Sequence, residues 1–234
     1  MVLGVLVAVA IVGAIVGAIA MLVRGGRNGM DFAPRNLVRL YLYVASMAGI
    51  IVLVVGLSGV LTVGFAAGFG NGFVYGDQSG FAPPVCAPTP EPNVKCAPGN
   101  PPDIAQQRQR ELDRRRGDDL IRGLTFTVFG AIFWGAHYFA RRGVMGPDEG
   151  SSGLRRGYLL LGTIIFGIAT VVLLPTGIYQ ALSYLILPAA DGVFRQGAGD
   201  SLPGGLVTLV VWLIYLWLVV RDVRSTPATA PTTT

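Results

Sequence analysis

Two short stretches decide the fold of this chain: Arg-Leu-Tyr-Leu-Tyr at positions 39–43 and Arg-Gly-Tyr-Leu-Leu at positions 156–160. Each opens an apolar segment, and the two segments align without a gap. In each copy a second apolar segment follows, centred on Trp134 in the first and on Trp212 in the second. A repeated unit buries its packing face against its copy. The repeat therefore predicts two tandem helical hairpins.

Composition places the chain in a membrane. Hydrophobic residues make up 52% of it and charged residues 13%, whereas a soluble domain carries about 25% charged residues. Five apolar segments reach or approach the roughly 20 residues that a membrane-crossing helix needs; they lie near residues 2–23, 40–65, 124–140, 158–187 and 206–220. We therefore expect an all-α integral membrane protein with five transmembrane helices, one N-terminal helix followed by the two tandem hairpins.

The expected organisation has four parts. Residues 1–30 hold the N-terminal transmembrane helix, 31–142 the first hairpin with a long Pro-rich loop at 70–119, and 143–224 the second hairpin. The tail at 225–234 contains only Ser, Thr, Pro and Ala, so we expect it to be disordered. Within the loop, residues 103–116 predict a polar helix with Glu111 and Arg115 spaced for an ion pair. Such a helix is better suited to meeting another protein than to burial.

Arginine sets the expected orientation, because positive residues accumulate on the cytoplasmic side. An outside N-terminus puts these arginines inside: Arg24, Arg27, Arg35, Arg39, Arg141, Arg142, Arg155, Arg156, Arg221 and Arg224. The loop at 70–119 is also arginine-rich, which opposes this assignment. Its two cysteines, Cys86 and Cys96, favour it, because such a pair suits a disulfide in an oxidising compartment, with two free thiols as the alternative. We expect a multi-pass protein of the bacterial inner membrane with the N-terminus and this loop outside and the C-terminus in the cytoplasm.

Several residues carry expected packing or anchoring roles. Gly13 and Gly17 lie in a small-residue row of the first helix, which favours either a dimer contact or packing on the chain's own hairpins. Pro175 interrupts the fourth predicted helix, where Thr170 and Thr176 are placed to bond the freed carbonyl. Arginine and aromatic side chains near helix ends anchor at the membrane interface; these are Arg39, Tyr41, Trp134, Arg141, Arg156, Tyr158 and Trp212.

His137 is the only histidine of the chain. Imidazole near the end of a membrane helix is able to ligate haem iron, with a second ligand drawn from three methionines; these are Met21, Met47 and Met145. The alternative is an interfacial position or a hydrogen bond between helices. The second copy has Tyr215 in the matching position, which removes an internal bis-histidine pair. Both interpretations of His137 remain open.

The paired pattern resembles an uncharacterised bacterial family of four-helix membrane proteins, known as a domain of unknown function. In each pair a basic residue and tyrosine open one helix. Tryptophan, followed three residues later by histidine or tyrosine and then by arginine, closes the next helix. The resemblance covers residues 35–142 and 155–221 and is carried by Arg39, Tyr41, Trp134, His137, Arg141, Arg156, Tyr158 and Trp212. Tyr215 in place of histidine and the long Pro-rich insertion depart from the pattern. The resemblance implies a fold and no activity.

The functional expectation is a non-catalytic structural or accessory subunit of a larger bacterial membrane complex, of respiratory or photosynthetic type. No Ser-His-Asp, Cys-His or paired-carboxylate arrangement supports an enzyme, and no cofactor is expected. Partners are the lipid bilayer and other membrane subunits, reached through the 70–119 loop and the first helix. Nucleic acid is not expected, because acids nearly balance bases in that loop. The alternatives are a haem- or quinone-binding electron-transfer component, resting on His137, and a small transporter built on the repeat, resting on Pro175.

Overall fold

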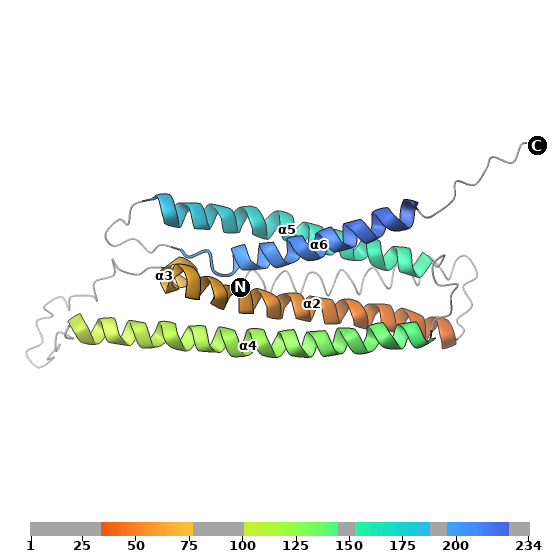
Figure 1. Cartoon of the computed structure of the whole chain (residues 1–234), viewed down its shortest axis with the longest axis horizontal. Helices are drawn as coiled ribbons and strands as arrows, with labels where there is room; N and C mark the ends of the chain where they lie inside the picture. Colours follow the sequence, from red (N-terminus) through yellow and green to blue (C-terminus); the bar gives the residue numbers. More distant parts are fainter. Residues whose placement is uncertain (1–33, 77–100, 145–152, 188–195, 225–234) are drawn as a thin grey trace, which may run out of the picture.

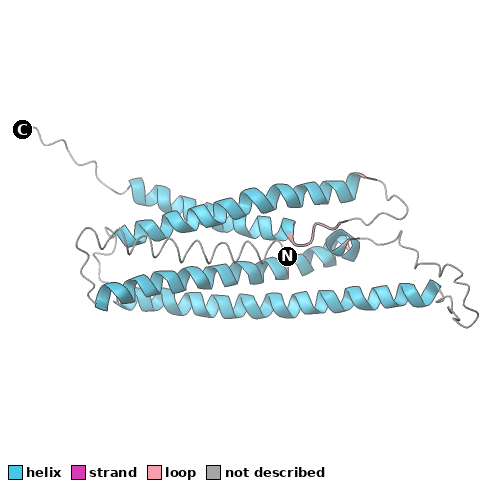
Figure 2. Cartoon of the chain, turned by 180° about the vertical axis from the view of Figure 1, so that it is seen from behind, coloured by secondary structure: helices cyan, strands magenta, loops and turns pink. Residues whose placement is uncertain are grey.

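The computed structural model describes residues 34–76, 101–144, 153–187 and 196–224. They form four long helices and a short one: α2 (Pro34–Phe69), α3 (Asn71–Tyr75), α4 (Pro101–Val144), α5 (Gly153–Ile186) and α6 (Ser201–Arg224). No strand occurs within these ranges (Figure 2). The prediction of an all-helical protein is confirmed for this part of the chain.

Four segments of the described helices are long and apolar enough to cross a membrane: Leu37–Phe69, Gln106–Gly143, Leu154–Ile186 and Ser201–Arg224. They correspond to four of the five predicted spans. The fifth, near residues 2–23, lies outside the described ranges together with Gly13 and Gly17. The Cys86 and Cys96 pair and the tail at 225–234 lie outside them as well. Their predicted roles therefore stay predictions.

The α4 helix differs from its predicted form. The expected span at 124–140 and the expected polar helix at 103–116 are parts of one continuous helix of 44 residues. Between them Gly117 and Gly123 disfavour helix, at a cost of about 1 kcal/mol each relative to alanine, but no proline interrupts the stretch. At 1.5 Å per residue the helix is about 66 Å long, roughly twice the hydrocarbon thickness of about 30 Å. Residues 71–75 are also helical, so much of the expected 70–119 loop is helix.

The long helices are arranged as two antiparallel pairs. The α4 helix packs along α2, and α6 packs along α5, while α2 also contacts α5 and α6 (Figure 1). The largest buried apolar cluster joins the pairs through residues of α2, α5 and α6: Met47, Ile51, Val54, Leu159, Phe166 and Tyr215. The α2 helix is therefore the element that holds the two hairpins together.

Glycines allow α2 and α4 to approach closely. A methyl group at Gly56 would overlap the backbone of Thr127, and one at Gly123 would come within 2.7 Å of the Val60 nitrogen. Apolar side chains gain little by leaving lipid, so close backbone contact is a main source of helix association in membranes. Several large apolar side chains in the second half of α4 are exposed, as a lipid-facing surface requires: Ile121, Leu124, Phe129, Ile132 and Phe139.

A second connection joins the hairpins at the end where α6 begins. The amides of Ala198 and Gly199 donate hydrogen bonds of 2.9 and 3.0 Å to the carbonyls of Phe73 and Val74 in α3. The Thr62 hydroxyl of α2 donates to the Gly199 carbonyl at 2.8 Å. Backbone groups outside the long helices are thereby satisfied within the protein, as a low-dielectric setting requires.

Candidate functional site

One end of the bundle is strongly basic. The α2 and α5 helices begin there and α4 and α6 end there (Figure 1). Among the described side chains it gathers Arg39, Arg141, Arg142, Arg155, Arg156, Arg221 and Arg224 against a single acid, Asp222. This end therefore carries a net positive charge in the described part of the chain.

Arg141 sits among aromatic rings from three helices. Its guanidinium carbon lies 4.9 Å from the ring centre of Tyr43, 5.4 Å from that of Tyr138 and 5.7 Å from that of Tyr158. A guanidinium within about 6 Å of an aromatic ring is attracted by the ring's negative face. Arg141 was predicted to anchor at the headgroups, and the structure places it where it also links α2, α4 and α5.

Polar contacts join the two helices of each hairpin at matching positions. The Tyr41 hydroxyl lies 3.4 Å from Nε2 of His137, whose Nδ1 lies 2.8 Å from the Phe133 carbonyl oxygen. In the other hairpin the Tyr215 hydroxyl donates a 2.7 Å hydrogen bond to the Tyr158 hydroxyl. The sequence alignment of the two copies pairs Tyr41 with Tyr158 and His137 with Tyr215. Each copy thus uses the same two positions for its helix-to-helix contact.

These contacts bear on the haem alternative. Nδ1 of His137 faces a carbonyl and is the donor, so Nε2 is left to accept from the Tyr41 hydroxyl. Haem ligation through Nε2 requires that contact to be given up. Of the three candidate second ligands, Met47 is 1% exposed within the core, and Met21 and Met145 lie outside the described ranges.

The two predicted tryptophan anchors face glycines of the partner helix. A methyl group at Gly49 would come within 2.9 Å of the Trp134 backbone, and one at Gly167 within 2.9 Å of Nε1 of Trp212. Both tryptophans lie well inside their helices, α4 and α6, instead of at their ends. They therefore take part in helix packing. The predicted role as interfacial anchors does not require such contacts.

Pro175 lies within α5 with its side chain exposed. Proline removes the bond to the carbonyl four residues earlier, that of Val171. The hydroxyl of Thr170 donates to the Phe166 carbonyl at 2.7 Å, and that of Thr176 to the Val172 carbonyl at 2.7 Å. The two threonines thus bond carbonyls other than the one that the prediction assigned to them.

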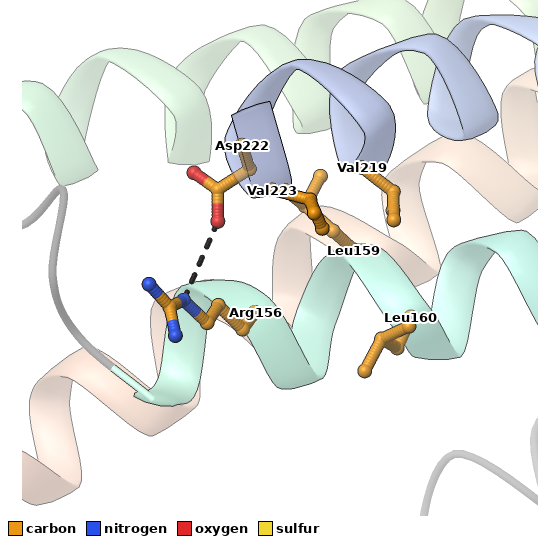
Figure 3. Close-up of a pocket in the computed structure, with 6 residues that line it drawn as sticks. All are labelled: Arg156, Leu159, Leu160, Val219, Asp222 and Val223. Atoms are coloured by element: carbon orange, nitrogen blue, oxygen red, sulfur yellow. Dashed lines mark ion pairs between the residues drawn. The ribbon is translucent and has the colours of Figure 1, made fainter. Parts of the chain in front are cut away.

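A groove between α5 and α6 opens at the basic end (Figure 3). Its volume is about 290 Å³, and it is lined by Arg156, Leu159, Leu160, Val219, Asp222 and Val223. Arg155 and Arg156 each approach an oxygen of Asp222 to 3.5 Å, and the Asp222 side chain is only 11% exposed. Sequence reasoning missed Asp222, although a lone acid among the arginines at the end of α6 was a visible signal.

The opposite end carries the polar part of α4. Arg115 and Glu111 form the predicted ion pair at 2.6 Å, with both side chains more than half exposed. Tyr75 of α3 lies near Asp119 of α4; burial, together with this carboxylate, raises the pKa of Tyr75 above its ordinary value. The hydroxyl of Tyr75 is therefore harder to deprotonate than that of an exposed tyrosine.

The four apolar helices define a helical, multi-pass membrane protein. The described residues contain no group of three or more His, Cys, Asp or Glu side chains placed to hold a metal ion. No protein-family model, curated protein or solved structure matches this chain. The family resemblance drawn from the sequence therefore stays a prediction.

Proposed function

We propose that this chain is a non-catalytic accessory subunit of a larger bacterial membrane complex, of respiratory or photosynthetic type. The observation that carries the proposal is the polar part of α4, which continues the membrane helix and which we call the arm (residues 101–119). The arm extends beyond α3 at the end of the bundle away from the arginines (Figure 1). It offers a rigid surface fixed to a membrane anchor.

The side-chain exposure of the arm supports a docking role. Exposed polar side chains follow one another along it: Gln106, Gln107, Gln109, Arg110, Glu111, Asp113, Arg114 and Arg115. A helix that is polar on all sides lacks a packing face of its own, and bridging between proteins is one of the few roles in which it persists. Its charges are of both signs in equal number, which suits a partner protein with complementary charges more than a nucleic acid.

The proposed orientation puts the basic end in the cytoplasm and the arm outside, in the inner membrane. The basic end joins seven described arginine side chains to one carboxylate, and an excess of arginine marks cytoplasmic segments. The arm carries five arginines, which oppose this orientation, because acidic residues contribute little to topology. The support comes from the larger number of arginines at the basic end.

The two alternatives receive less support. The electron-transfer alternative needs Nε2 of His137, which faces Tyr41. The transporter alternative rests on Pro175, whose side chain is exposed instead of facing the seam between the hairpins. Three buried hydroxyls, those of Ser58, Thr170 and Thr208, are bonded within their own helices. The Thr62 hydroxyl also donates to the Gly199 carbonyl, and the buried Ser46 hydroxyl of α2 has no hydrogen-bond partner among the described residues.

The test is site-specific photo-crosslinking in the native membrane. A photoreactive residue at Gln107 on the arm should give one crosslinked product of defined size, identified by mass spectrometry. The same residue at Ile132, on the lipid-facing part of α4, is the control for random collisions. The partner should also co-purify at a fixed ratio in mild detergent. Equal amounts of crosslinked product from both positions would contradict the proposal, and so would a protein that purifies without a partner. A visible absorption band that is lost in His137→Ala would favour the electron-transfer alternative.

A further inference from the structure

The groove between α5 and α6 combines an apolar floor with a basic rim. Leu159 is buried in its floor, while Leu160 and Val223 are 52% and 69% exposed. At its rim, the Arg156 guanidinium faces the carboxylate of Asp222 (Figure 3). The Arg155 guanidinium approaches the same carboxylate. The rim therefore has a surplus of one positive charge beside an apolar channel.

The rim also lies at the first turn of a long helix. The α5 helix begins at Gly153 and has no acidic residue in its first turn. The amide groups of a first turn point out of the helix end, and the macrodipole adds a partial positive charge there. An anion at the level of Arg155 and Arg156 thus meets two guanidinium groups and a helix N-terminus.

We propose that this groove binds one anionic phospholipid, with its phosphate at Arg155 and Arg156 and an acyl chain along Leu159, Leu160, Val219 and Val223. Basic pockets between membrane helices at the cytoplasmic side are suited to anionic headgroups. Both arginines approach Asp222 at 3.5 Å, longer than the 2.7–2.9 Å of a strong charged hydrogen bond. A guanidinium that turns toward a phosphate therefore gives up a long contact with Asp222 and gains a shorter charged one.

The balance of charges at the rim gives the site its expected selectivity, and Asp222 sets that balance. Its carboxylate holds both arginines at the groove and competes with a phosphate for them. Because two positive charges share one negative charge, a lipid with one negative charge neutralises the rim, whereas a zwitterionic lipid does not. The groove should therefore prefer phosphatidylglycerol over phosphatidylcholine.

The test is native mass spectrometry of the full-length protein in mild detergent, titrated with phosphatidylglycerol or phosphatidylcholine of identical acyl chains. One phosphatidylglycerol should bind at least about fivefold more tightly than one phosphatidylcholine, the effect of one surface arginine. Arg156→Gln should abolish this preference and Arg156→Lys should keep most of it. Arg142→Gln removes one exposed charge from the same end on α4 and should leave the preference unchanged.

Two further variants separate the parts of the site. Asp222→Asn should strengthen phosphatidylglycerol binding, because it removes the competing carboxylate, whereas a purely structural role of the ion pair predicts a loss. Leu160→Trp should weaken binding of the lipid by filling the groove. Inorganic phosphate at millimolar concentration should not displace phosphatidylglycerol. The proposal would be overturned if phosphate displaced the lipid or if Leu160→Trp had no effect on lipid binding. It would also be overturned if Arg142→Gln lost the preference for phosphatidylglycerol as fully as Arg156→Gln. Circular dichroism should confirm that each variant is folded.

Discussion

The hydroxyl of Tyr215 in α6 donates a 2.7 Å hydrogen bond to the hydroxyl of Tyr158 in α5. Tyr215 is 4% exposed, and its ring also packs 5.6 Å from that of Phe166. Gly162 makes room for it, because a methyl group there would overlap the Tyr215 ring. Tyr215 thus holds α5 and α6 together both by a hydrogen bond and by the packing of its ring.

Removing the Tyr215 hydroxyl should destabilise the protein measurably. Tyr215→Phe leaves the Tyr158 hydroxyl without this partner, and we expect a loss of about 1 kcal/mol in the free energy of unfolding. Tyr41→Phe is the matched control, because Tyr41 is 60% exposed and 3.4 Å from His137. Unfolding by a denaturing detergent measures both. If Tyr215→Phe and Tyr41→Phe lost equal amounts of unfolding free energy, the Tyr215–Tyr158 hydrogen bond would not be the cause of the loss. The same would follow if the losses of Tyr215→Phe and Tyr158→Phe added up in the double variant.

The contact of α2 with α4 should not tolerate a single methyl group. Gly56→Ala places a Cβ against the backbone of Thr127, and overpacking of this kind costs typically about 1–3 kcal/mol. Gly64→Ala is the control on the same helix, since nothing lies within 4 Å of a Cβ there. It should be neutral or stabilise slightly, because alanine favours helix over glycine. The midpoint of thermal unfolding in detergent checks both, and similar midpoints would contradict the close approach.

The orientation can be tested with single cysteines in a background where Cys86 and Cys96 are replaced by serine. Gln107→Cys lies on the arm and Gly143→Cys at the basic end, and both positions are exposed. A membrane-impermeant thiol reagent should label Gln107→Cys in cells whose inner membrane is intact. It should label Gly143→Cys only after permeabilisation. The reverse pattern would invert the proposed topology.

The arm and the membrane part of α4 should keep a fixed separation. Spin labels at Gln107 and Ile132 of a straight helix are expected about 38 Å apart, which double electron–electron resonance resolves as a narrow distribution. Gly117→Pro should shift and broaden it, because proline inside a helix breaks a hydrogen bond and kinks the chain. Gly117→Ala should sharpen it or leave it unchanged. A broad distribution in the unmodified chain would contradict a continuous helix.

Hydropathy located the described spans well, because a membrane-crossing helix must be apolar over most of its length. The pair of Glu111 and Arg115 was also predictable from helical spacing alone. The continuity of α4 was not, since the change from polar to apolar composition near residue 119, between Gly117 and Gly123, resembles a boundary, although no proline ends the helix there. Hydropathy marks where the apolar part of a helix ends, and the helix itself can continue beyond that point.

The candidate sites were less predictable than the spans. The groove depends on how α5 and α6 lie together, which brings Asp222 to Arg155 and Arg156 from far along the sequence. Arg141 and the two tryptophans illustrate the same limit. A residue type near a helix end predicts an interfacial position, but only the packing of three helices shows that Arg141 is surrounded by tyrosine rings.

The unbroken course of α4 makes it a mechanical rod between the two faces of the membrane. If a partner displaced the arm along its axis, a rigid α4 would move Arg141 by the same distance. A twist of the arm would turn Arg141 relative to Tyr43 on α2 and Tyr158 on α5. A rigid α4 would thus connect the arm to the junction of the two hairpins, about 66 Å of helix in all.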